Sequence, residues 1–235
     1  MARTALRVVL LALLVVTGAA AQSDGTSHWG VTATFVPSWK VASNAKFLYD
    51  ADSIDIGGGE FSIGVARGRS YGGDWGITYI RRSFSDGSYV DKGFGTFCFV
   101  ASASCVDTGT HYSLGNVVLN GIEGHKFVSF ATIKRRVQVG MIFGGGVAWA
   151  DGVVEGTYRR VELMPGGPVI VEGTEQVKYT DLFLGGHLSV VPLAQVEVAV
   201  NAILAPGLKA RFSGGYNFPG YNVARISIVY LIGSH

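Results

Sequence analysis

The sequence predicts an all-β fold, an eight-stranded antiparallel up-and-down β-barrel that spans a membrane. Apolar and polar residues alternate with a period of two in many segments, which is typical of strands with two different faces. The 235 residues are 48% apolar and only 15% charged, whereas an average soluble domain is about 25% charged. Beyond the first 20 residues, no apolar run approaches the ~18 residues that a spanning helix needs.

The N-terminal segment, residues 1–21, has the layout of a secretory signal peptide. It has a positive start with Arg3 and Arg7, an apolar core, and small residues at Ala19–Ala21 where cleavage is expected. The alternative, a single membrane anchor, needs a longer apolar segment. Cleavage removes two of the 19 basic residues and none of the 17 acidic ones, so residues 22–235, the expected barrel domain, carry no formal net charge. A neutral chain has no electrostatic basis for binding nucleic acid.

Eight alternating segments are the expected strands of the barrel. In chain order they are 29–39, 56–69, 73–84, 115–133, 136–150, 176–191, 195–204 and 223–232. The alternation is less strict in 115–133 and 176–191 than in the other six.

The connections between these segments alternate between long and very short. They are 40–55, 70–72, 85–114, 134–135, 151–175, 192–194 and 205–222. A strand meander that crosses a bilayer has this layout, with short turns on the periplasmic side and longer loops outside. The long connections also hold most of the Asp-Gly and Pro-Gly dipeptides that favour turns.

Residues 208–216 leave the strand count open, because apolar and polar side chains alternate there as well. The apolar members are Leu208, Ala210 and Phe212, and the polar members are Lys209, Arg211 and Ser213. This segment can extend the seventh strand past Pro206-Gly207, form a hairpin above the membrane, or belong to a ten-stranded barrel. A simple ninth strand is disfavoured, because both chain ends are expected on the periplasmic side.

The composition of the polar faces favours a membrane barrel over a lipocalin-like one, which turns its polar face to water. These faces hold mostly Gly, Ser, Thr and Ala, with few charges. Aromatic residues mark the ends of the apolar faces, and we expect them to form a girdle: Trp29, Trp39, Trp75, Trp149 and Tyr230. Trp29 and Trp39, ten residues apart on one face, would span about 25 Å along the axis, the height of a lipid-facing band.

The inward faces carry polar and charged residues that we expect to fill the lumen as a paired, hydrogen-bonded network. An eight-stranded barrel is just wide enough for its own side chains to fill it. The alternative is a narrow polar pathway through the lumen. The expected members of the network are Glu60, Arg82, Glu123, His125, Asp181, His187, Glu197, Asn201 and Arg225.

The two cysteines, Cys98 and Cys105, are expected to form a disulfide that closes a short loop in an oxidising compartment. Zinc needs more ligands at a matching spacing, and none are nearby. His125 and His187 would meet across the lumen without a third ligand, so we expect no metal site. The sequence has no Gly-rich phosphate loop, and we expect no cofactor.

Two His-x-Ser pairs, His111-Tyr112-Ser113 and His187-Leu188-Ser189, could each bring an imidazole and a hydroxyl together on one face of a strand. The first resembles part of the His-x-Ser-Asn motif of outer-membrane lipid A deacylases, with Glu123 as the acid. Leu114 stands where that motif has Asn. Two residues recur often by chance, and we expect no enzyme.

The chain as a whole resembles the small outer-membrane β-barrel proteins of Gram-negative bacteria, the OmpA- and OmpW-like transmembrane domains. The resemblance is one of pattern. Its most specific piece is the last strand, Ala224-x-Ile226-x-Ile228-x-Tyr230, which is similar to the C-terminal signal that the outer-membrane assembly machinery reads. That signal usually ends at a terminal aromatic residue, whereas Leu231–His235 follow here.

This resemblance implies an exported monomer in the outer membrane, in contact with lipid and lipopolysaccharide and inserted by the assembly machinery. Because the long loops 85–114 and 151–175 contrast with an interior that lacks a convincing catalytic set, we expect a non-enzymatic barrel. Its loops would act in adhesion, stress tolerance or envelope integrity. The alternative is passive transport of a small solute through a narrow channel.

Overall fold

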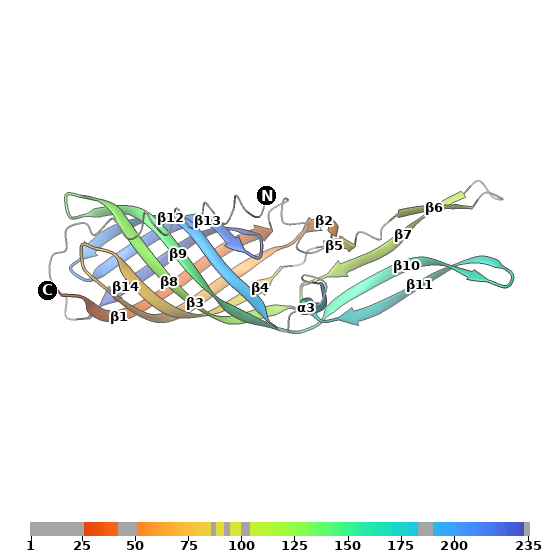
Figure 1. Ribbon diagram of the computed structural model, residues 1–235, viewed down its shortest axis with the longest axis horizontal. Coiled ribbons are helices and arrows are strands. Elements are labelled where there is room, and N and C mark those ends of the chain that lie inside the picture. Colours follow the sequence, from red (N-terminus) through yellow and green to blue (C-terminus); the bar gives the residue numbers. More distant parts are fainter. Residues whose placement is uncertain are drawn as a thin grey trace, which may run out of the picture.

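A computed structural model describes residues 26–41, 51–85, 88–91, 95–99, 104–182 and 190–232. Eight long antiparallel strands close into a barrel, and shorter strands form a second sheet that projects beyond one end of it (Figure 1). The predicted all-β, eight-stranded antiparallel barrel is therefore confirmed. Among the described residues, no helix is long and apolar enough to cross a membrane.

Each barrel strand pairs with the barrel strand before it and the barrel strand after it along the chain. Their hydrogen-bonded order is β1-β14-β13-β12-β9-β8-β4-β3, and pairing of β1 with β3 closes the barrel. The bounds of these strands are β1 (His28–Val41), β3 (Gly57–Gly68), β4 (Asp74–Phe84), β8 (Val118–Ile133), β9 (Val137–Asp151), β12 (Val191–Ala205), β13 (Leu208–Phe218) and β14 (Tyr221–Leu231).

The second sheet, here called the extension, comes from the three long connections that follow β1, β4 and β9 (Figure 1). Its order is β11-β10-β7-β5-β2, and β6 pairs with β7. The bounds are β2 (Ala51–Asp55), β5 (Ser88–Asp91), β6 (Gly95–Phe99), β7 (Ser104–Ser113), β10 (Val154–Met164) and β11 (Gly167–Val177), followed by the single helical turn α3 (Tyr179–Leu182). At ~3.3 Å per residue, the β10–β11 hairpin is about 35 Å long.

The opposite end of the barrel, here called the short-turn end, has three tight connections. They are residues 69–73, 134–136 and 206–207. The predicted alternation of long and short connections holds as far as β9–β12. The last connection differs, because only residues 219–220 join β13 to β14 at the extension end, where a long loop 205–222 was expected.

The predicted strand 176–191 is wrong as a barrel strand, and residues 208–218 take its place as β13. Residues 176 and 177 end β11, 179–182 form α3, and 183–189 lie outside the described residues. Residues 192–194, expected as a turn, lie inside β12. The predicted count of eight is still correct, because β13 takes the place of the predicted barrel strand 176–191.

Two Pro-Gly dipeptides explain why 208–218 is a strand by itself. Pro206-Gly207 is the tight turn between the paired residues Ala205 and Leu208, and Gly207 has a φ of 76°. At the other end, Pro219-Gly220 reverses the chain, and Gly220 has a φ of 96°. A positive φ favours Gly at both positions, and at Gly207, directly after Pro206, it is typical of a type II turn.

The outward face of the barrel is apolar and the inward face is polar, the reverse of a soluble barrel. Along β14, for example, Ile226, Ile228 and Tyr230 are exposed, whereas Arg225 and Ser227 are buried. Of the five expected girdle residues, Trp29, Trp75, Trp149 and Tyr230 lie on the outer face and are at least 40% exposed. The rings of Trp29 and Trp75 meet edge to face with centroids 5.5 Å apart.

The fifth expected girdle residue, Trp39, lies inside the barrel and is 2% exposed. The strand register shifts between Phe35 and Trp39, and both Pro37 and Ser38 face outward. Because Pro37 has no N–H to donate to a neighbouring strand, it favours a bulge at this point. The extra residue reverses the alternation and turns Trp39 into the lumen.

Cys98 and Cys105 form a disulfide between β6 and β7, as predicted. The bond lies in the extension, and both cysteines are exposed. The disulfide therefore links two strands of the extension and makes no link to the barrel wall.

Candidate functional site in the barrel lumen

The lumen contains balanced charge. Among the described residues, eight charged side chains are at most 7% exposed, four of them acidic and four basic: Glu60, Asp74, Arg82, Glu123, Glu197, Lys209, Arg211 and Arg225. A buried charge is costly unless an opposite charge and hydrogen bonds compensate it. Their pairing divides them into two networks, which differ in position along the barrel.

Arg225 of β14 is the centre of the first network. Its guanidinium lies 2.9 Å from Oε1 of Glu197 on β12 and 3.1 Å from Oε1 of Glu60 on β3. The contact with Glu60 is made by Nη1 of Arg225, and this atom is also 3.8 Å from Oε1 of Glu123 on β8, the strand opposite β14 in the barrel. One arginine therefore connects four strands across the middle of the lumen.

Arg82 and Ser213 complete this first network. Nε of Arg82 donates to Oε2 of Glu60 at 2.8 Å, and the guanidinium stacks 4.5 Å from the ring centroid of Tyr221. Ser213 donates from Oγ to Oε2 of Glu197 at 2.6 Å. These contacts leave three carboxylates facing two guanidinium groups in the central network.

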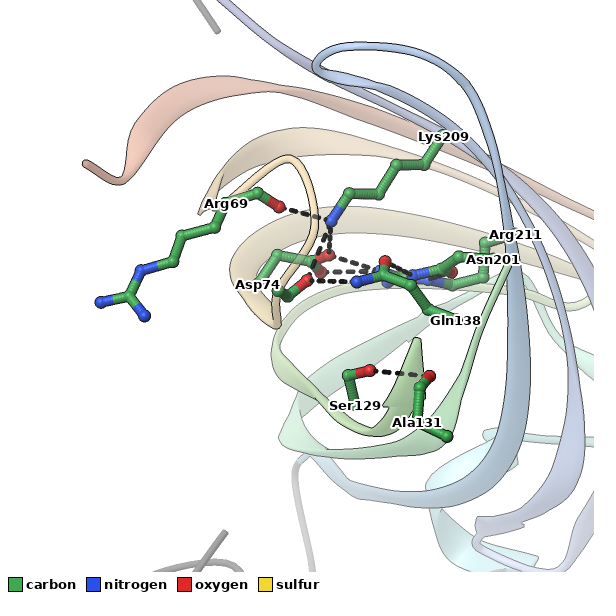
Figure 2. Close-up of polar contacts among 9 residues, drawn as sticks. Arg69, Asp74, Ser129, Ala131, Gln138, Asn201, Lys209 and Arg211 are labelled. Carbon is green, nitrogen blue, oxygen red and sulfur yellow. Dashed lines mark hydrogen bonds and ion pairs between the residues drawn. The ribbon is translucent and has the colours of Figure 1, made fainter. Parts of the chain in front are cut away.

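Asp74 of β4 is the centre of the second network, at the short-turn end (Figure 2). Nη2 of Arg211 donates to both carboxylate oxygens of Asp74, at 2.8 and 2.6 Å, and Nζ of Lys209 lies 3.4 Å from Oδ2. Arg211 also donates from Nε to Oδ1 of Asn201 at 2.7 Å. Because β13 and β4 are opposite walls of the barrel, these bonds cross the lumen.

The turn between β3 and β4 is tied to the same network. Lys209 donates from Nζ to the carbonyl oxygen of Arg69 at 2.7 Å and to that of Gly72 at 3.0 Å, as Figure 2 shows in part. Nε2 of Gln138, on β9, also donates to the Gly72 oxygen, at 3.2 Å. Residues 69–73 are therefore held against strands on the other side of the opening.

An apolar cluster, here called the cap, closes the extension end of the lumen. Tyr179 of α3 is fully buried there, its hydroxyl 2.8 Å from that of Tyr221 and its ring 5.1 Å from Phe84. Trp39 packs on both Phe84 and Tyr221, at 5.1 and 4.6 Å. The cap comprises Val36, Trp39, Ile56, Ile80, Phe84, Leu114, Val117, Leu119, Ala148, Val154, Tyr179, Val191, Leu193, Tyr221 and Val223.

A cavity of about 20 Å³ lies between the two charged networks. Arg225 and Arg211 line it from the two sides, together with Glu123, His125 and several Ser and Thr hydroxyls. Its volume holds about one water molecule. Inward glycines make room for the large side chains, since a Cβ on Gly76 would lie 3.0 Å from the His125 ring. Among the described residues, side chains thus occupy the lumen at the level of the cap and at the level of each charged network.

The structure brings most of the predicted lumen residues together. Glu60, Arg82, Glu123, Glu197 and Arg225 lie in the central network, Asn201 joins the Asp74 network, and His125 lines the cavity. Asp181 does not belong to the lumen. The chain forms the helical turn α3 here, and Asp181 is therefore exposed. Its carboxylate accepts a hydrogen bond from the Lys178 amide at 3.3 Å. His187 lies outside the described residues.

Four members of the Asp74 network were missed from the sequence: Asp74, Gln138, Lys209 and Arg211. A signal for two of them was present, because Lys209 and Arg211 alternate with the apolar Leu208, Ala210 and Phe212. Once 208–218 is accepted as a strand, that alternation places both cations in the lumen.

The structure does not bring His111, Ser113 and Glu123 together as the deacylase motif would require. His111 and Ser113 lie on β7 of the extension, where they pair with Thr157 and Glu155 of β10. Glu123, the acid that the deacylase motif would use, is buried inside the barrel. The second pair, His187-Leu188-Ser189, lies outside the described residues. Within the described part of the chain, no three His, Cys, Asp or Glu side chains are grouped to hold a metal ion.

No family model matches the sequence, and no curated protein matches it significantly. Among solved structures, the chain is similar to Ail, the attachment invasion locus protein of Yersinia pestis in complex with sucrose octasulfate, at 7% identity and a TM-score of 0.32, over 88% of this chain and 99% of that chain. The β domain of the Bordetella autotransporter BrkA is similar at 11% identity and a TM-score of 0.30, with coverages of 88% and 99%. An outer membrane channel from Pseudomonas putida F1 is similar at 8% identity and a TM-score of 0.25, with coverages of 90% and 97%.

Proposed function

We propose that this protein is a non-conducting, non-enzymatic outer-membrane barrel that anchors the extension and presents it outside the cell. The observation that carries the proposal is the filled lumen. The cap, the Arg225 network and the Asp74 network lie one after another along the barrel axis. Passive transport would require all three to open, and we therefore rank it below display.

The outer face supports insertion into a membrane. Large apolar side chains alternate outward on all eight strands, and aromatic residues lie toward both ends. Such a surface is stable in a bilayer and would aggregate in water. On this proposal residues 1–21 are the export signal, and β14, with Ala224, Ile226, Ile228 and Tyr230 outward, is the strand that the assembly machinery reads.

The extension supports display as the purpose of the barrel. The β10–β11 hairpin has an apolar tip, with Met164, Val169 and Ile170 between 40% and 48% exposed. The charged pair Arg159–Glu172, at 2.6 Å, lies just behind this tip. Apolar side chains exposed at the tip of a projecting hairpin are available to contact another surface. We therefore place adhesion first among the roles of the displayed sheet.

Epitope insertion tests the orientation. A tag inserted between Gly166 and Gly167, at the hairpin tip, is expected to bind antibody on intact expressing cells. The same tag inserted after Arg135, in a short turn, is expected to bind only after the outer membrane is permeabilised. Antibody binding to the second tag on intact cells, or recovery of the protein in the soluble fraction, would contradict the proposal.

Substitution of the tip tests its role in adhesion. Val169→Lys with Ile170→Lys is expected to reduce binding of expressing cells to epithelial monolayers or immobilised matrix proteins. The matched control is Thr174→Lys with Gln176→Lys, which adds the same charge lower on the same strand. Equal binding by both double variants and the wild type would exclude the tip as the adhesive surface.

A further inference from the structure

The short-turn end of the barrel carries an exposed basic rim. Its members come from two neighbouring connections and the strand that precedes one of them: Arg67, Arg69, Lys134, Arg135 and Arg136. All are exposed except Arg69, which is half-buried. Arg69 is fixed through its carbonyl oxygen by Lys209, while its guanidinium points away from the Asp74 network (Figure 2).

The described residues of this end expose no acidic side chain. The acidic residue found there is Asp74, which is buried and bonded to Lys209 and Arg211. The exposed acidic groups, such as Asp55, Asp151 and Glu172, belong to the extension and to the strand ends next to it. The surface charge is therefore asymmetric along the barrel axis.

The backbone of the rim shows a second unusual feature. Lys134 and Arg135 both have positive φ, 48° and 54°, in the turn between β8 and β9. Tight hairpin turns of this kind strongly favour Asn-Gly, because other residues are strained there. Arg135 also stacks 5.6 Å from the ring centroid of Tyr71 in the neighbouring turn. Two cations thus occupy positions where the fold itself would prefer other residues, an observation that suggests a functional use.

Arg67 sets the level of the rim relative to the lipid. It pairs with Trp29 on one side and Trp75 on the other, and its guanidinium lies 5.4 Å from the Trp29 ring centroid. Tryptophan on the outside of a membrane protein prefers the headgroup level. The rim therefore lies where phospholipid phosphates would be, and Arg and Lys bind phosphate oxygens through charge-assisted hydrogen bonds.

We infer that the basic rim binds the headgroups of anionic phospholipids in the periplasmic leaflet of the outer membrane. Membrane lipid is favoured over a soluble polyanion because Arg67 lies on the lipid-facing side, between two girdle tryptophans. The inference rests on the membrane insertion and orientation proposed above. It adds a lipid specificity that neither the barrel fold nor the display of the extension requires.

Tryptophan quenching by brominated lipid tests the inference. In a Trp149→Phe background, Trp29 and Trp75 are the tryptophans on the outer face, near the rim. The purified barrel is reconstituted into phosphatidylcholine vesicles that contain brominated phosphatidylglycerol. Quenching by the brominated anionic lipid is expected to exceed its mole fraction, with a relative binding constant of about five, since one interfacial cation contributes about that factor.

Neutralising the rim removes the preference if the inference is right. Arg67→Gln with Arg69→Gln, Lys134→Gln, Arg135→Gln and Arg136→Gln is expected to bring the relative binding constant to about one. The matched control, Lys40→Gln with Arg81→Gln, Arg159→Gln, Arg160→Gln and Lys178→Gln, removes five cations near or within the extension and is expected to leave the constant unchanged. A charge-retaining variant, Arg69→Lys with Arg136→Lys, is expected to keep the preference and shows that substitution alone does not cause its loss.

The outcomes separate the inference from the proposal on which it rests. A wild-type relative binding constant of about one, or equal loss in the rim and control variants, overturns lipid binding by the rim. If inorganic phosphate binds the purified barrel while the brominated anionic lipid shows no preference, the rim is a site for free phosphate and the lipid assignment is wrong. Absence of quenching by brominated phosphatidylcholine itself would instead show that the barrel does not insert, and would overturn the proposed function.

Discussion

Arg211 and Asp74 join opposite walls of the barrel through two hydrogen bonds, of 2.8 and 2.6 Å, from one guanidinium nitrogen to the two carboxylate oxygens. The residues are 137 positions apart in the chain. Lys209 extends the same link to the turn between β3 and β4. The short-turn end of the lumen is therefore closed by an ion-pair network that the strands bring together only when the barrel closes.

Loss of the Asp74 carboxylate is expected to destabilise the barrel strongly. Asp74→Ala leaves Lys209 and Arg211 buried without a counter-charge, which typically costs about 3–5 kcal/mol. Urea unfolding of the protein in lipid vesicles measures the change. The control, Asp151→Ala, removes an exposed carboxylate at the extension end of β9. A loss of unfolding free energy for Asp74→Ala no larger than for this control would refute the stabilising role of the Asp74 network.

Trp39 is expected to be shielded from lipid. A variant that retains only Trp39, with Trp29→Phe, Trp75→Phe and Trp149→Phe, should show little quenching by brominated phosphatidylcholine. A variant that retains only Trp29 should be quenched strongly, because that ring lies on the outer face. Similar quenching of both would mean that Trp39 belongs to the girdle and that the bulge at Pro37 is absent.

β13 is expected to cross the membrane, although its segment was not assigned as a strand of its own from the sequence. Phe212 points outward on this strand and is 53% exposed. An arginine on the lipid face costs about 2–4 kcal/mol near the bilayer midplane, so Phe212→Arg should lower the free energy of unfolding by about that amount. Thr174→Arg, on the exposed β11, should change it by less than about 0.5 kcal/mol. Equal effects would place residues 208–218 outside the bilayer.

Reduction of the disulfide is expected to act on the extension alone. Cys98 and Cys105 join β6 to β7, which are remote from the barrel strands in the sheet order. Dithiothreitol should therefore speed limited proteolysis between residues 95 and 113. The migration of the unheated, folded barrel on a denaturing gel should stay the same. Loss of that migration on reduction would show that the barrel depends on the disulfide.

The alternation of side chains predicts the barrel well, because each strand of a membrane barrel has one lipid-facing and one lumen-facing side. It also places Glu60, Arg82, Glu123, Glu197 and Arg225 inward, where the structure has them. Alternation does not give the partners, however. Which carboxylate meets Arg225 depends on strand register and on contacts across the lumen between residues far apart in the chain.

The errors have local physical causes. An extra residue at the Pro37 bulge reverses the facing of Trp39, and a strict period of two cannot show such a reversal. The leucines of 176–191 suggest a lipid-facing strand, although part of that segment forms α3 and places Tyr179 in the cap. The Pro-Gly turns on either side of β13 were a usable signal, since each combines a fixed φ with a glycine that accepts the left-handed region.

The central claim is that the lumen is closed, and conductance in planar lipid bilayers tests it most directly. The wild-type barrel, inserted from detergent at high salt, is expected to give no stable single-channel steps under applied voltage. Insertion is verified in the same preparation by the resistance of the barrel strands to proteolysis in vesicles. Reproducible, ohmic channel openings from the wild-type protein would contradict the claim and favour a transport pathway through the lumen.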